Sequence, residues 1–190
     1  MSVYKTCNTV GVRMLLETPV RTLGPVDHKP LKAAVEAIRA DAWLEDTIRQ
    51  KSFEQHKATQ SIVMQFCSSW PEMTVEQRKG WDYFAEPANA LIASIVRDNY
   101  PPGGRIIRSM VAKLLAGGRI ALHKDGHPSF AVAHRIHVPL VTNPQVDFLI
   151  RGVNHYLEEG VAYEVSNLDY HAVTNRGPDR IHFIFDYTLQ

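Results

Sequence analysis

The chain has 190 residues with 21 basic and 20 acidic side chains and neither a basic run nor an acidic tail, so its charge favours no nucleic acid and no anionic membrane as partner. Two cysteines, Cys7 and Cys67, are too few for a disulfide framework or a cysteine zinc site, and no window approaches about 20 consecutive apolar residues. We therefore expect a cytoplasmic protein of one domain, residues 1–190, with its own hydrophobic core and a small-molecule or peptide ligand.

The first part of the chain, up to residue 104, is predicted to be mostly helical. Apolar residues recur at helical spacing over 31–44, which predicts an amphipathic helix. Thr74 and Gln77 match the pattern of a capping box, so a second helix is expected to begin at Thr74. A third is expected to begin near Pro87 and to end before the Pro-Pro-Gly-Gly run at 101–104.

From residue 105 onward, short runs rich in Ile, Val, Phe and Tyr alternate with turn signals, which is typical of an all-β region. The predicted strands are 105–114, 119–125, 134–142, 146–151, 154–157, 161–166, 169–174 and 180–188, with one or two more in the earlier part, at 60–67 and 10–16. Eight short strands suit a double-sheet jelly roll. We therefore predict a mainly β fold with a core at 105–190 and the N-terminal helices packed on the outer face of one sheet.

Two histidines and a carboxylate form the most informative pattern in the chain. Residues two apart on a strand point to the same face, so His123 and Asp125 can reach one ion while His171 approaches from a distant strand. Two histidines with one carboxylate are a ligand set for non-haem Fe(II), with open positions for a co-substrate and O2. The alternative is a surface turn before Gly126 together with a core histidine.

The predicted strand 134–142 carries a second signal, because Arg135 and His137 alternate with apolar residues and therefore share a face. If this face lines the interior, the pair would meet an anionic ligand, since burying them unpaired is costly. If it is solvated, they have no special role. His127, His134, His155 and His182 are expected to be surface or packing histidines.

The segments LHKDG, HRIHVPL, LEEGVAYEVSNLDYHAVTN and RIHFIFDY resemble, in order and spacing, the aspartyl/asparaginyl β-hydroxylase family, a branch of the Fe(II)/2-oxoglutarate dioxygenases with a double-stranded β-helix fold. The resemblance covers about residues 105–187. It implies that His123, Asp125 and His171 hold Fe(II), and that 2-oxoglutarate chelates this metal before O2 binds. The best-known animal members have glycine in place of Asp125, so this chain is more similar to small bacterial relatives, which include enzymes that hydroxylate free proline.

The far carboxylate of 2-oxoglutarate calls for a fixed guanidinium able to bind both of its oxygens. The resemblance assigns that role to Arg180, with Arg176 as a weaker competitor and with Ser109 or Lys113 as candidate helpers. It also implies that Arg135 and His137 contact 2-oxoglutarate near the metal. An exposed arginine at the start of a strand is the alternative for Arg180.

The function implied by the resemblance is hydroxylation of an amino-acid side chain, free or within a peptide, with release of succinate and CO2. The polar stretch 49–60 is a candidate loop over the pocket, where Arg49 or His56 would hold a substrate carboxylate. Two alternatives remain open. One is a cupin-like isomerase or hydrolase that does not use 2-oxoglutarate, and the other is a non-catalytic module that binds a metal or a small acid.

Overall fold

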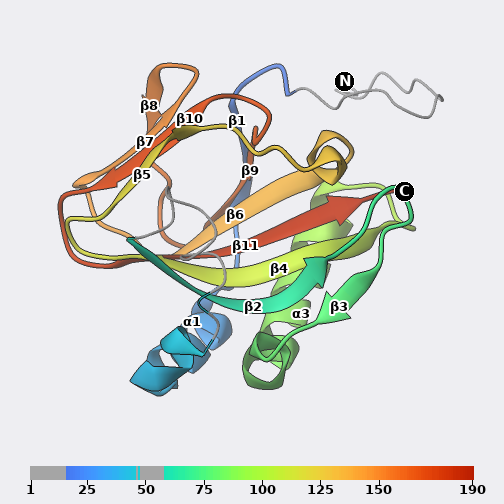
Figure 1. The fold of residues 1–190 in the computed structure, drawn as a ribbon, viewed down its shortest axis with the longest axis horizontal. Coiled ribbons are helices and arrows are strands. Elements are labelled where there is room, and N and C mark those ends of the chain that lie inside the picture. Colours follow the sequence, from blue (N-terminus) through green and yellow to red (C-terminus); the bar gives the residue numbers. More distant parts are fainter. Residues whose placement is uncertain (1–15, 46, 48–57) are drawn as a thin grey trace.

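Two antiparallel sheets make up most of this computed structural model, which describes residues 16–45, 47 and 58–190 (Figure 1). The strands are β1 Val20–Pro25, β2 Thr59–Cys67, β3 Val75–Gln77, β4 Arg105–Leu114, β5 Arg119–His123, β6 His134–Val141, β7 Val146–Ile150, β8 Val153–His155, β9 Val161–Val165, β10 His171–Asn175 and β11 Arg180–Thr188. The helices are α1 Lys29–Ala37 and α3 Gly80–Asn99, with 3-10 turns η1 Ala40–Leu44 and η3 Pro128–Ala131.

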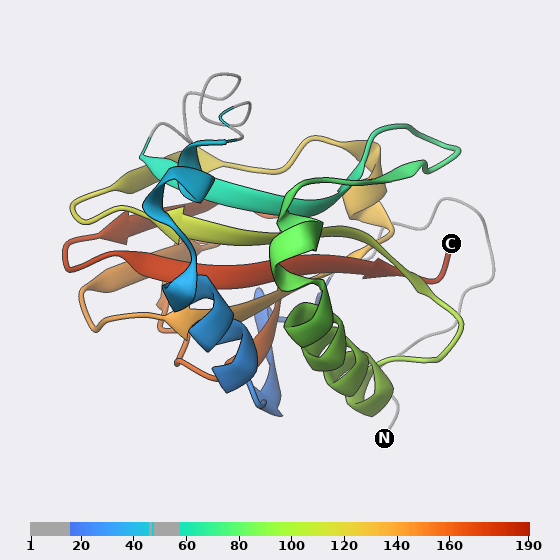
Figure 2. The same ribbon diagram turned by 90° about the horizontal axis from the view of Figure 1, so that it is seen from below.

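The larger sheet has the strand order β1-β9-β6-β11-β4-β2-β3, and the smaller has the order β5-β10-β7-β8. Helices α1 and α3 lie across the outer face of the larger sheet, as the view from below shows (Figure 2). The predicted fold class, a jelly roll with helices on one sheet, is confirmed, and each strand expected from residue 105 onward is present within a few residues of its predicted limits. β1 and β3 were not predicted, and the stretch 10–16 lies outside the described residues.

The helical predictions need two corrections. The helix expected over 31–44 ends at Ala37, where Ile38 becomes extended, and resumes as the turn η1. The helix expected to begin at Thr74 is wrong, because residues 75–77 pair with β2 as strand β3. The Thr74 carbonyl instead accepts a hydrogen bond from the Ser68 amide, which closes the β2–β3 hairpin.

Helix α3 begins at Gly80 and continues through Pro87, the residue at which a separate helix was expected. Its buried side chains form one stripe on both sides of the proline, and this packing on the sheet outweighs the backbone hydrogen bond that proline cannot make. A Cβ at Gly80 would lie 2.6 Å from the Val63 carbonyl oxygen, so only glycine allows the helix to begin this close to β2. No helix in the described ranges is long and apolar enough to cross a membrane.

The larger sheet has one apolar and one polar face. The side chains that pack against the helices include Val111, Ile136, Val138, Leu140, Phe183 and Phe185. The alternate residues of the same strands face the smaller sheet and include Arg108, Arg135, His137, Arg180, His182 and Asp186. A second apolar cluster, drawn from both sheets, closes the space between them and includes Leu114, Phe148, Ile150, Val165 and Val173.

Candidate metal centre

His123 and His171 lie opposite each other on the paired strands β5 and β10, with ring centroids 4.3 Å apart. The Nδ1 of His123 donates to the Ala121 carbonyl at 2.8 Å, and the Nδ1 of His171 donates to the Asp169 carbonyl at 2.8 Å. These bonds place the proton on Nδ1, so Nε2 of each ring is the atom that can bind a metal. Burial lowers the pKa of His171, which favours the neutral imidazole that a metal requires.

Asp125 completes the group, although it does not lie on the strand. The sequence predicted a strand to residue 125, but β5 ends at His123. The Asp125 amide then donates to the carbonyl of Asn167 at 3.1 Å, and this bond turns the carboxylate back toward the histidines. Asp125 Oδ1 lies 3.8 Å from His123 Nε2, and the ligand atoms of Asp125 and both histidines all lie within 4.8 Å of one another.

Arg135 connects this group to a buried carboxylate behind it. Its guanidinium donates to Asp125 Oδ2 through Nη1 and to both oxygens of Asp186, at 2.8 Å from Nε and 3.0 Å from Nη2. Burial alone would lower the pKa of Arg135, but Asp186 and Asp125 outweigh it and raise the pKa above its ordinary value. Of the two alternatives left open by the sequence, Arg135 therefore has the interior position, with its charge matched by two carboxylates.

Arg180 is in the opposite situation. It is 4% exposed, and its guanidinium carbon lies 5.6 Å from the centre of the Phe148 ring. Its Nη2 donates to His182 Nδ1 at 2.7 Å. Its Nε is buried without a hydrogen-bond partner among the described residues. No described carboxylate forms an ion pair with the Arg180 guanidinium. Burial lowers the pKa of Arg180 to about 9. A buried cation without an anion is costly, so this pocket is suited to receive one.

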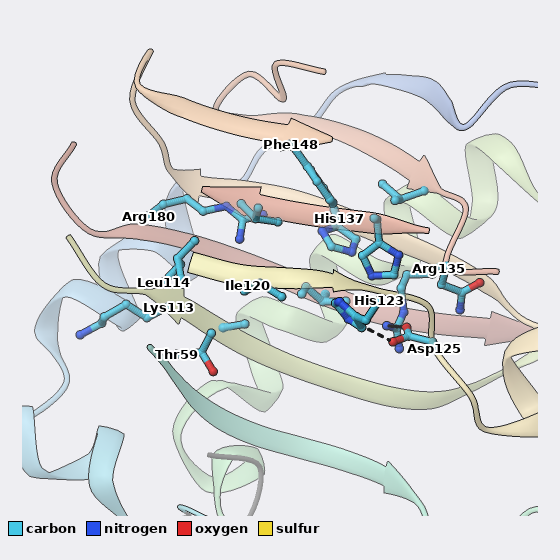
Figure 3. A pocket seen from close by; sticks show the side chains of 16 residues that line it. Thr59, Lys113, Leu114, Ile120, His123, Asp125, Arg135, His137, Phe148 and Arg180 are labelled. Atoms are coloured by element: carbon cyan, nitrogen blue, oxygen red, sulfur yellow. Dashed lines mark hydrogen bonds and ion pairs between the residues drawn. The ribbon is translucent and has the colours of Figure 1, made fainter. Parts of the chain in front are cut away.

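His137 lies between the two ends of the pocket. Figure 3 shows Arg180 at one end, His123 and Asp125 toward the other, and His137 with Phe148 between them. Burial lowers the pKa values of His137 and His182 well below the ordinary range, and the charge of Arg180 adds to this. Both rings are therefore neutral, and their Nδ1 atoms lie 3.4 Å apart. His182, expected only to pack or to lie at the surface, is a buried hydrogen-bond acceptor for Arg180.

Of the other predicted residues, Lys113 lines the pocket, while Ser109 and Arg176 are not among its lining residues. Ser109 donates to Gln65 at 3.2 Å, and the Lys113 amine lies 3.9 Å from the ring centre of Trp43, so neither has a contact with Arg180 in the described structure. Arg176 forms an exposed ion pair with Asp147. Arg49 and His56 are outside the described residues.

Asn167 and Asp186 are site residues that sequence reasoning missed. Asn167 lines the pocket with Asp125 and His171, is 5% exposed, and has a buried Nδ2 without a hydrogen-bond partner among the described residues. Nothing in the sequence indicates this position. Asp186 did have a signal, since it shares the even-numbered face of its strand with Arg180 and His182. The remainder of the lining is mainly apolar and includes Leu114, Ile120, Phe148, Val165, Val173 and Ile184.

Comparison with known proteins gives one family. A family model described as aspartyl/asparaginyl beta-hydroxylase matches residues 32–189, which is most of the chain. No curated protein matches the sequence. The match begins well before residue 105, so it includes the helical part for which the sequence suggested no relative.

Solved structures with the same fold share little sequence with this chain. HygX from Streptomyces hygroscopicus, solved with nickel, 2-oxoglutarate and hygromycin B, is 14% identical with a TM-score of 0.55 over 90% of this chain and 83% of that one. A Pseudomonas putida prolyl-4-hydroxylase is 14% identical with a TM-score of 0.51 over 92% and 94% of the two chains. A 2OG-Fe(II) oxygenase family oxidoreductase from Burkholderia pseudomallei is 11% identical with a TM-score of 0.52 over 71% and 70%.

Proposed function

Because the chain belongs to the aspartyl/asparaginyl β-hydroxylase family, we propose that it is an Fe(II)/2-oxoglutarate-dependent oxygenase that hydroxylates an amino-acid side chain, free or within a peptide. The observation that carries the proposal is the presence, in one pocket, of two features that this chemistry needs. One is a group of two histidines and a carboxylate, and the other is a buried guanidinium with no carboxylate partner among the described residues.

The donor set fits Fe(II). His123, Asp125 and His171 offer two neutral imidazoles and one carboxylate oxygen, and no thiolate lines the pocket in the described structure. Bound Fe(II), together with 2-oxoglutarate and O2, supplies the oxidation of a substrate C–H bond, with succinate and CO2 as the other products. The two Nδ1 hydrogen bonds to backbone carbonyls fix the orientation of the imidazole rings, so Nε2 of each ring could bind a shared ion.

Arg180 is our candidate for binding the far carboxylate of 2-oxoglutarate. Its Nε is buried and has a hydrogen to donate, and its side chain is held from one side by His182 and from the other by Phe148. A carboxylate placed there would compensate a charge that has no other anion among the described residues. His137 lies between this end and the metal ligands, and Arg135 lies beside Asp125 (Figure 3). We propose that both contact 2-oxoglutarate, Arg135 through an N–H that no described carboxylate uses.

The apolar lining and Asn167 complete the role of the protein in this reaction. Leu114, Phe148 and Val173 keep water away from the space between Arg180 and the metal ligands, which strengthens each polar contact inside. We propose that Asn167 donates its amide N–H to an oxygen of the substrate beside the metal. The description of the family supports our choice of an amino acid as the substrate class, and a prolyl hydroxylase has the same fold.

The first test is anaerobic. Fe(II) and then 2-oxoglutarate are added to purified protein, and the weak visible charge-transfer band of the chelate is recorded for wild type, His171→Ala and His155→Ala. His155 lies on the same small sheet but outside the metal group, so it is a matched control. We expect the band in wild type and in the control and its loss in His171→Ala. No band in folded, iron-loaded wild type would overturn the oxygenase proposal.

The second test concerns the substrate. Succinate release is measured in air with a panel of free amino acids and short peptides. We expect release above the substrate-free rate for at least one of them. A protein that binds Fe(II) and 2-oxoglutarate but shows no release with the whole panel would contradict the amino-acid substrate and keep the co-substrate assignment.

A further inference from the structure

We propose that Arg135, held by Asp186, is a positioning residue that makes Asp125 bind the metal through one oxygen only. This inference rests on the proposed function, since it concerns how the Fe(II) site keeps positions open. It adds a role for Arg135 and gives the first role to Asp186, a buried carboxylate that does not line the pocket.

The guanidinium of Arg135 is fixed from behind. Its Nε and Nη2 donate to the two oxygens of Asp186, which is a two-point contact that sets the plane of the guanidinium. Asp186 is 0% exposed and also accepts from Arg108 Nη1 at 3.5 Å. Arg108 in turn donates to Ser129 Oγ at 2.8 Å. Each partner of this network is buried, so Arg135 has little freedom to turn.

The remaining corner of the guanidinium points to the metal ligand. Nη1 of Arg135 donates to Asp125 Oδ2, whereas Asp125 Oδ1 is the oxygen that lies 3.8 Å from His123 Nε2. The two oxygens of one carboxylate therefore have different partners. Oδ1 faces the histidines. Oδ2 accepts a hydrogen bond from the positively charged guanidinium, which would repel a metal ion bound to the same oxygen.

This division matters for the number of open positions. A carboxylate can bind a metal through one oxygen or through both. In an octahedral site, two histidines and a single carboxylate oxygen leave room for a two-point chelate and for O2. A second oxygen from Asp125 would take one of those positions. By holding Oδ2, Arg135 keeps the position available.

The charges around Arg135 support this role. Arg108 and Arg135 are matched by Asp125 and Asp186, so these four side chains are neutral together. Phe130 covers both guanidiniums, with its ring centre 4.4 Å from the central carbon of Arg135 and 4.5 Å from that of Arg108. The charge of Arg135 is therefore matched by carboxylates, in contrast to that of Arg180.

The test separates metal binding from co-substrate binding. Asp186→Asn removes the charge of the carboxylate behind Arg135 without changing its shape, and Arg135→Lys keeps the charge but loses the fork that joins two carboxylates. The control is Glu164→Gln, because Glu164 is a buried carboxylate of the same sheet, paired with Arg21 at 2.7 Å, on the face away from the metal group. The dissociation constants of Fe(II) and, at saturating Fe(II), of 2-oxoglutarate are measured anaerobically. The visible spectrum of each Co(II)-loaded protein reports the coordination number.

We expect Fe(II) to bind about 10- to 100-fold more weakly to Asp186→Asn and Arg135→Lys, a range typical when an outer partner of a metal ligand is lost, and to bind unchanged to Glu164→Gln. The Co(II) spectrum should change in the two variants and not in the control. If Asp186→Asn does not fold, Arg135→Lys is sufficient for the test.

Unchanged Fe(II) affinity with weakened 2-oxoglutarate binding in Arg135→Lys would overturn the inference and leave Arg135 as a co-substrate contact alone. Unchanged values for both ligands would also overturn it. Failure of the proposed function looks different, because wild type itself would then bind no Fe(II) or no 2-oxoglutarate.

Discussion

The two faces of the seven-stranded sheet both bury side chains, but mostly of opposite chemical kinds. On β6 and β11, Ile136, Val138 and Phe183 pack against the helices, while their sequence neighbours His137 and His182 face the smaller sheet. The helix face is mainly apolar, and its apolar layer supplies stability. The inner face buries arginines, histidines and an aspartate, which supply little or no stability by their burial. Alternate residues of one strand can therefore serve two purposes, with one set stabilising the fold and the other lining the inner face.

The inner face is itself divided. Around Asp186 the charges are matched, with two arginines and two carboxylates in contact. Around Arg180 they are not, because the described residues supply a neutral histidine and an aromatic ring but no carboxylate. A fold does not need an unmatched buried cation, so the mismatch supports our proposal that a ligand binds at this part of the face.

The largest expected effect tests the apolar face. Phe183→Ala removes a fully buried ring from the helix side, and we expect the free energy of unfolding to fall by about 3–5 kcal/mol, the usual result for a buried phenylalanine. Fe(II) affinity of the folded protein should remain as in wild type, because the ring points away from the metal group. Urea unfolding and anaerobic Fe(II) titration measure the two quantities. A loss of Fe(II) affinity in protein that is still folded would show that the two faces are coupled.

The alternation behind this comparison could be predicted from the sequence. A period of two along 134–142 placed Arg135 and His137 on one face, and the structure has them there. The same period should have drawn attention to Asp186. Its partner Arg108 could not be found this way, because the pairing of β11 with β4 depends on register between distant segments, which local pattern does not give.

The errors concern places where tertiary contacts override a local signal. Thr74 has the residues of a helix cap, but β2 offers the next three residues a strand partner. Pro87 resembles a helix start, but the apolar stripe on both sides of it packs on the sheet. Asp125 was expected to reach the metal from a strand and instead faces the two histidines from the loop after β5, because its amide bonds to Asn167. Each outcome depends on a neighbour that lies far away in the sequence.

The next prediction concerns the unmatched charge. Arg180→Met replaces the guanidinium with an apolar side chain of similar length, so we expect 2-oxoglutarate to bind roughly 100-fold more weakly, or about 2.7 kcal/mol. Stability should be equal to that of wild type or higher by about 1–3 kcal/mol, because a buried cation without an anion has been removed. Calorimetric titration and thermal unfolding measure the two effects. Arg180→Glu should abolish turnover, and intact turnover in that variant would favour a cupin-like enzyme that does not use 2-oxoglutarate.

The smallest expected effect is a pH dependence on the inner face. His182 is buried and neutral, with its pKa lowered by burial and then by Arg180 and His137. An unfolded histidine has a pKa of about 6.5, so below that pH the unfolded state takes up a proton that the folded state does not. Stability from this group is therefore present above about pH 6.5 and falls as the pH is lowered, by up to about 1.4 kcal/mol per pH unit.

His182→Asn isolates this contribution. Asparagine offers a carbonyl oxygen close to the position of the histidine Nδ1, so Arg180 keeps an acceptor while the titrating group is lost. Urea unfolding at pH 5, 6 and 7 should show a shallower loss of stability in the variant than in wild type, by close to one proton. His137 remains in both proteins, so its own contribution cancels in the difference. If the free energy of unfolding changed equally with pH in both proteins, His182 would take up a proton in the folded state beside Arg180. The inner face would then hold a second unmatched positive charge.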